Sequence, residues 1–140
     1  QFDNAYALRR FVKEFGGNIR TEPYFDGPGV VFIASATKSY DALKAAIELG
    51  GDVDKPNEQM LTPLLAAIEQ NDTRATTILI NGGADINFGP CNGITPLFGS
   101  VICGNVECTR MLIAAGCDLD SRAHQNEKDT AGDTPLTAAI

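Results

Sequence analysis

The segment Thr62-Pro63-Leu64-Leu65-Ala66-Ala67 opens with a tripeptide that occurs twice more in this chain of 140 residues. Thr-Pro-Leu returns at Thr95 and again at Thr134. A second landmark follows the first two openings at one and the same offset, as Asp85-Ile86-Asn87 and Asp118-Leu119-Asp120. A recurring period of about 33 residues indicates an array of similar units rather than one irregular domain.

Each Thr-Pro pair has the chemistry of a helix start. A Thr at the N-cap accepts a hydrogen bond from a helical N–H that lacks a partner, and a Pro after it has no N–H to leave unpaired. We predict a first helix from Pro63 to about Gln70, a turn at Asn71, and a second helix over about residues 72–81 that ends at Gly82-Gly83. Helices of about ten residues are marginal alone in water, so they need stacked neighbours to bury their apolar faces.

These residues resemble the ankyrin repeat, a unit of about 33 residues marked by T-P-L-H-x-A and by a G-A-D-V-N-like ending. The ending is matched by Gly83-Ala84-Asp85-Ile86-Asn87, and the neighbouring units end in Gly50-Gly51-Asp52-Val53-Asp54 and Gly116-Cys117-Asp118-Leu119-Asp120. The resemblance covers essentially the whole chain. It implies an all-α fold, an ankyrin-repeat solenoid of stacked helix-turn-helix units with short β-hairpin loops.

Dividing the chain at these openings predicts a single ankyrin-repeat domain over residues 1–140. In order, the units are half a repeat at 1–28, full repeats at 29–61, 62–94 and 95–133, and the start of a further repeat at 134–140. Neither end has the polar outer face of a terminal repeat. We therefore expect the chain to be a stretch of a longer array or of a larger protein.

The sequence departs from the ankyrin pattern at several positions. Leu65, Phe98 and Thr137 replace the His that follows Thr-Pro-Leu, so we expect Leu65 and Phe98 to pack as apolar residues instead. The first full unit has Gly29-Val30 in place of Thr-Pro, and Lys38 replaces its turn glycine. A Cβ in the left-handed conformation of that turn costs about 1 kcal/mol or more. We therefore expect the first full unit to be less regular than the two after it.

The third full unit contains an insertion of six residues, which falls within residues 121–130. This stretch is polar and charged, so it is expected to lengthen one loop between repeats. Two interpretations stay open. Loops accept extra length at little cost in stability, so the insertion can be without function, or it can form a finger specific to a partner.

The charge balance argues against a nucleic-acid partner. The chain has 11 Lys and Arg against 18 Asp and Glu, a net charge of −7, whereas nucleic-acid binding depends on cationic side chains. The hydrophobic fraction of 44% favours a packed core over disorder. The longest apolar run, at residues 30–36, is far shorter than the roughly 20 residues that span a bilayer, and no secretory signal is visible. We expect neither membrane insertion nor secretion.

The cysteines and the histidine form no recognisable metal or catalytic motif. Cys91, Cys103, Cys108 and Cys117 contain no CxxC pair, and His124 is the only histidine, so we expect no metal site and no cofactor. Free cysteines indicate an intracellular and cytoplasmic protein. The motifs GxGxxG, GxxxxGK[ST], GxSxG and HExxH are absent, and Cys108 is predicted to be a small buried apolar residue. We expect no enzymatic activity.

Binding is then the expected function, because repeat arrays present an extended concave surface. In the proteins that this chain resembles, the hairpin tips and the exposed face of each first helix make most contacts. The corresponding tip residues are Phe25, Asp26, Pro28, Glu58, Gln59, Leu61, Cys91, Asn92 and Ile94, and the helix-face residues are Ala36, Thr37, Glu69, Gln70, Ile102 and Cys103. For Leu61 and Ile94, packing against the neighbouring repeat is an equally open interpretation.

We therefore predict a scaffold that binds a protein partner with a basic or mixed-charge face. Two alternatives stay open: a regulatory or targeting segment of a larger enzyme or channel, and an architectural component of a large assembly. Asn87, eight residues after Leu79, also resembles a site of asparaginyl hydroxylation in ankyrin repeats. A turn-capping role for that side chain is the simpler interpretation.

Overall fold

The computed structural model describes residues 6, 9–10, 29–90 and 93–120 of the chain. Between residues 29 and 120 the described chain forms six helices in three successive pairs. They are α2 (Val30–Ala36), α3 (Tyr40–Glu48), α4 (Pro63–Glu69), α5 (Thr73–Asn81), α6 (Pro96–Ile102) and α7 (Val106–Ala114). The predicted half-repeat at 1–28, the insertion and the unit at 134–140 lie wholly or largely outside the described residues.

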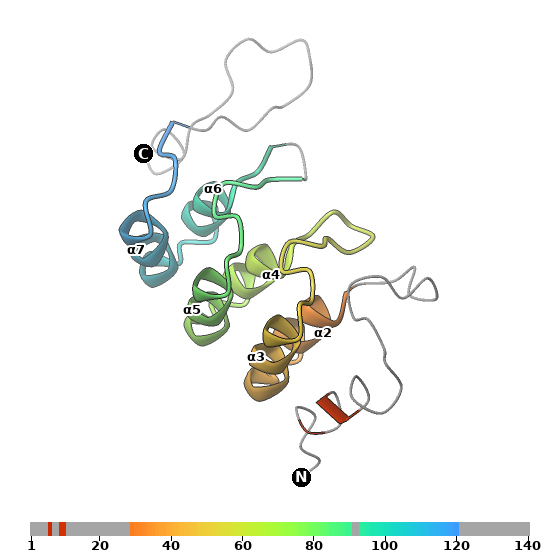
Figure 1. The fold of residues 1–140 in the computed structure, drawn as a ribbon. Helices are drawn as coiled ribbons and strands as arrows, with labels where there is room; N and C mark the ends of the chain where they lie inside the picture. Colours follow the sequence, from red (N-terminus) through yellow and green to blue (C-terminus); the bar gives the residue numbers. More distant parts are fainter. Residues whose placement is uncertain (1–5, 7–8, 11–28, 91–92, 121–140) are drawn as a thin grey trace.

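The helices stack in two layers, which Figure 1 shows as two parallel rows. The helices of seven residues, α2, α4 and α6, form one layer, and the helices of nine residues, α3, α5 and α7, form the other. The two helices of each unit contact each other, and equivalent helices of successive units contact each other as well. The predicted all-α repeat solenoid is therefore confirmed. The short β-hairpins that were expected in its loops are not seen, because the described residues contain no β-strand.

The helix starts predicted at Thr62 and Thr95 are confirmed by capping hydrogen bonds, whereas Thr134 lies outside the described residues. Thr62 Oγ1 accepts from the backbone N–H of Leu65 at 3.2 Å, and Thr95 Oγ1 accepts from that of Phe98 at 3.3 Å. Asp72 caps α5 in the same way, since its Oδ1 accepts from the N–H of Ala75 at 3.0 Å. These bonds satisfy N–H groups that a helix leaves unpaired at its first turn.

The turns inside the three units share one backbone conformation. Lys38, Asn71 and Gly104 occupy the same position in successive units, and all have positive φ angles, of 56°, 52° and 69°. The left-handed turn at Lys38 is thus present although its residue carries a Cβ. Gly83, with φ at 89°, follows the end of α5 as the sequence predicts.

The expectation that the first full unit is less regular is wrong for its helices. The α2 and α3 helices are seven and nine residues long, the same lengths as in the next two units. What differs is capping: neither Gly29 nor Ser39 caps its helix through a side chain, whereas both helices of the second unit and α6 of the third have such a cap. Contacts with the next unit compensate: α2 packs on α4, and α3 packs on α5.

The core runs along the boundary between the two layers. Its largest fully buried side chains are Leu43, Leu64, Ile68, Leu79, Leu112 and Val31. Cys108 is also fully buried, as predicted, and its Sγ lies 3.9 Å from Thr76 Oγ1. Leu65 and Phe98 are buried too, so the two residues that replace His pack as apolar groups.

One position in the loop after each second helix connects consecutive units. Asp54 Oδ1 accepts a hydrogen bond from the backbone N–H of Asp85 at 2.9 Å. The equivalent residue of the next unit, Asn87, accepts from the N–H of Asp118 at 2.7 Å through its Oδ1. The Asn87 side chain therefore has a structural role between units, and its hydroxylation stays a prediction.

Candidate protein-binding groove

A groove of about 460 Å³ opens between α4, α6 and the loop that precedes α4. Half of its lining residues are aliphatic, and the others include one carboxylate and two amides. The lining residues are Asn57, Gln59, Leu61, Leu65, Ile68, Glu69, Ile94, Gly99, Ile102 and Cys103. A largely apolar hollow with a few polar groups is what binding sites in proteins generally offer.

The floor of the groove belongs to the core of the solenoid. Leu65 and Ile68 are both buried, and they extend from the same α4 helix that Thr62 caps. Gly99, in the middle of α6, lies opposite: a Cβ built on it would be 3.3 Å from Leu65 Cδ2. The missing side chain at Gly99 therefore makes room for the Leu65 side chain, which forms this part of the floor.

The loop beside the groove is held closed by its own hydrogen bonds. Asn57 Oδ1 accepts from the backbone N–H of Gln59 at 3.0 Å and from that of Leu61 at 2.9 Å. The N–H of Asn57 in turn donates to the carbonyl oxygen of Leu61 at 2.9 Å. A partner that binds here meets a loop that is already ordered, so less conformational entropy is lost on association.

The rim of the groove is exposed and carries negative charge. Ile102 has 61% of its surface exposed. Glu69 is exposed as well and forms no ion pair with any described residue. The described lining contains no Lys or Arg, so the groove has no cation of its own to neutralise this carboxylate.

The structure brings together six of the residues selected from the sequence: Gln59, Leu61, Glu69, Ile94, Ile102 and Cys103 all line the groove. Leu61 and Ile94 are half-buried and also line the groove. Packing against the neighbouring repeat and contact with a partner therefore both stay open for them. That any of these residues contacts a partner stays a prediction.

The remaining selected residues do not line the groove or are not described. Glu58 and Gln70 are exposed next to lining residues, whereas Ala36 and Thr37 lie at the end of α2. Those outside the described residues are Phe25, Asp26, Pro28, Cys91 and Asn92.

Sequence reasoning missed four lining residues, Asn57, Leu65, Ile68 and Gly99, as members of this site. Leu65 and Ile68 read as core residues, which they also are. The sequence signal that could have indicated this site is Gly99, which stands where the preceding unit has Ala66. A glycine inside a helix weakens the helix, so it points to a close approach of another residue.

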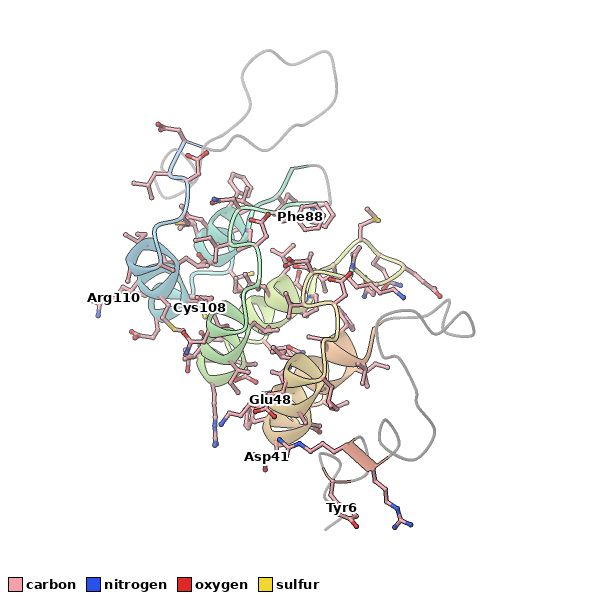
Figure 2. The ribbon with its side chains drawn as sticks, viewed as in Figure 1. Tyr6, Asp41, Glu48, Phe88, Cys108 and Arg110 are labelled. Carbon is pink, nitrogen blue, oxygen red and sulfur yellow. The ribbon has the colours of Figure 1, made fainter. Side chains whose placement is uncertain are left out.

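The three described thiols differ in accessibility. Cys103 is exposed in the groove, whereas Cys108 and Cys117 are buried. Burial raises the pKa of both the Cys108 and the Cys117 thiol, which keeps them protonated and unreactive. Figure 2 shows Cys108 and Arg110 on α7 and Glu48 on α3, all in the layer of the nine-residue helices.

The described residues contain no group of three His, Cys, Asp or Glu side chains that could hold a metal ion. No described helix is long and apolar enough to cross a membrane. His124, the partner that a cysteine nucleophile would need, lies outside the described residues.

The comparisons with known proteins agree with this architecture. A family model described as three copies of ankyrin repeats matches residues 31–123, more than half of the chain. The chain therefore belongs to the ankyrin-repeat family, whose members are in general protein–protein interaction modules.

Among solved structures, the chain is similar to the ankyrin repeat domain of Bcl-3, described as a unique member of the IκB protein family. The TM-score is 0.74 and the sequence identity 25%, over 82% of this chain and 48% of that one. The chain thus spans about half the length of that structure. No curated protein matches it by sequence.

Proposed function

We propose that this chain is a non-catalytic scaffold that binds a protein partner through the groove between α4 and α6 and the loops beside it. The observation that carries the proposal is the exposed aliphatic side chain of Ile102 in a hollow whose floor, Leu65 and Ile68, is part of the rigid core. An apolar centre surrounded by polar groups is the usual composition of a specific interface. Membership of the ankyrin-repeat family supports the same function.

The charge of the site supports a partner with a basic or mixed-charge face rather than a nucleic acid. The chain carries a net charge of −7, and Glu69 faces the groove without a described cationic partner. Such a surface attracts cationic proteins and repels phosphate backbones. We also propose an intracellular, cytoplasmic location, which the free thiols of Cys103, Cys108 and Cys117 support.

We further propose that the repeats divide at 29–61, 62–94 and 95–133, and that the chain works within a longer protein or assembly. The exposed apolar side chains of Val106 and Ile113 on α7 support this context. Large exposed apolar groups on one helix are typical of surfaces that another element covers.

Affinity capture from the cell of origin tests the binding function. The groove variant combines Glu58→Lys, Glu69→Lys and Ile102→Asp. The control variant makes the same changes in charge and polarity away from the groove, as Glu48→Lys, Glu107→Lys and Leu119→Asp, and circular dichroism verifies that both are folded.

We expect one or more proteins to be retained by the wild type and by the control variant and lost from the groove variant. Raising the salt concentration should weaken the capture, because part of the attraction is electrostatic. Equal recovery of every retained protein on both variants would overturn the proposal that the groove is the binding surface.

A further inference from the structure

The middle of α6 contains a glycine at a position of the groove where the preceding unit has an alanine. Gly99 occupies the position that Ala66 fills in the preceding unit, where Ala66 is buried. A glycine inside a helix is less favourable than alanine by about 0.5–1 kcal/mol. Here an added Cβ would lie 3.3 Å from Leu65 Cδ2, closer than ordinary van der Waals contact, so the glycine makes room for the Leu65 side chain.

Each element that forms the groove contributes at least one apolar side chain to its walls. Leu61 and Ile94 contribute from the loops, Ile68 from the α4 helix and Ile102 from α6. The volume of about 460 Å³ lies within the range of about 300–1,000 Å³ of ligand sites and is partly open to solvent. It has room for an apolar side chain that a partner inserts between Leu65 and Ile102.

A carboxylate stands beside this apolar space. Glu69 occupies in α4 the position that Ile102 occupies in α6, and both line the groove. The last turns of α4 and α6 contain no basic residue, and the described lining contains none. A cation on the partner is therefore the charge that complements this edge of the groove.

We propose that the groove recognises a peptide segment of a partner protein in which an aliphatic side chain is adjacent to an Arg or Lys. The aliphatic side chain packs on Leu65 and Ile102 in the groove, and the cation lies against Glu69. This inference rests on the proposed function and specifies the chemistry of the partner.

Cys103 provides a local reporter for the occupant. It lines the groove and is exposed, whereas Cys108 and Cys117 are buried. In a Cys91→Ser background, a thiol-alkylating reagent at neutral pH should modify Cys103 fastest among the described cysteines. An occupant of the groove covers this thiol and slows its alkylation.

The test uses three synthetic peptides of about ten Gly and Ser residues, with Leu-Arg, Ser-Arg or Leu-Glu at the centre. Alkylation of Cys103 is followed by mass spectrometry over a titration of each peptide. We expect protection by the Leu-Arg peptide, about tenfold weaker apparent binding of the Ser-Arg peptide, and about two- to fivefold weaker binding of the Leu-Glu peptide.

Two variants and one control assign the effect to the two groups. Gly99→Ala, whose added Cβ pushes the Leu65 side chain out of its position in the floor, should weaken the Leu-Arg peptide. Glu69→Gln should remove the preference for Leu-Arg over Leu-Glu, whereas the matched exposed change Glu107→Gln on α7 should leave it intact.

Each opposite result overturns the inference. Equal protection by Leu-Arg and Ser-Arg would exclude the apolar anchor, and protection by none of the peptides would exclude this ligand class. Protection of Cys103 without peptide that rises with protein concentration would identify a second copy of the chain as the occupant. If the peptides fail while the cellular partner is still lost from the groove variant, only this inference fails and the binding function stands.

Discussion

The first unit, with α2 and α3, and the second unit, with α4 and α5, have helices of matching lengths, yet their sequences support those helices very differently. In the second unit both helices begin with a side-chain cap, from Thr62 and from Asp72. In the first unit neither Gly29 nor Ser39 supplies one, and the turn between the helices requires a left-handed Lys38.

Contacts with the second unit hold the first one in shape. The Tyr40 hydroxyl donates to Asp72 Oδ2 at 3.1 Å, and the Arg74 guanidinium carbon lies 4.6 Å from the centre of the Tyr40 ring. Ser35 Oγ donates to the carbonyl oxygen of Pro63 at 3.4 Å. The comparison teaches that stacking on a well-capped neighbour can impose helix geometry that local signals support only weakly.

The largest expected effect comes from a core position at which the two units differ in side-chain size. Leu79 is fully buried, and the equivalent residue of the first unit is Ala46, also fully buried. Leu79→Ala should lower the free energy of unfolding by about 2–5 kcal/mol, because it leaves a cavity between α5 and its neighbours. Urea unfolding followed by circular dichroism measures this loss.

The matched control is Ile113→Ala, which shortens an aliphatic side chain that is half exposed on α7. It should cost much less than the core variant. If the two variants are equally destabilised, the second unit is not the part on which the solenoid depends.

An intermediate effect is expected at the cap that the first unit lacks. Thr62 is buried, and Thr62→Ala leaves the N–H of Leu65 without its acceptor. The free energy of unfolding should fall by about 1 kcal/mol. Thr77→Ala, at an exposed position inside α5, is the control and should be close to neutral. A Thr62 variant as stable as the Thr77 variant would show that stacking alone also holds the second unit.

The smallest effect is expected at the loop position that connects consecutive units. Burial raises the pKa of Asp54, and the charges of Asp85 and Asp52 raise it further, while the hydrogen bond from the Asp85 N–H lowers it. Asn87 makes the equivalent bond in the next unit without a charge. Asp54→Asn should therefore stabilise the chain at neutral pH by about 0.3–0.5 kcal/mol, since solvent screens this half-buried group.

The pH dependence of this difference follows from the direction of the shift. Because the pKa of Asp54 is higher in the folded state, protonated Asp54 favours folding below the pKa of the unfolded chain. That contribution is lost as the pH rises through the folded-state pKa. The stability gained by Asp54→Asn should thus grow across this window and be constant above it, as urea midpoints at several pH values would reveal. A gain that is independent of pH would contradict the role of the charge.

Local features of the fold were predictable from the chain alone. The capping roles of Thr62 and Thr95, the left-handed turn at Lys38 and the burial of Cys108 all follow from residue type and from the repeat period. Each depends on chemistry between near neighbours in the chain or on a position repeated from unit to unit. For the same reason, six residues of the groove could be selected by their position in the repeat.

The regularity of the first unit and the shape of the groove could not be predicted in this way. They depend on side chains that approach from different units, such as Tyr40 with Asp72 and Leu65 with Gly99. Residue type and period therefore set where helices begin, turn and bury their faces, because those choices are made by neighbouring backbone groups. The groove above Leu65 and the regular helices of an uncapped unit were decided only when the units stacked, because the contacts that produce them join residues of different units.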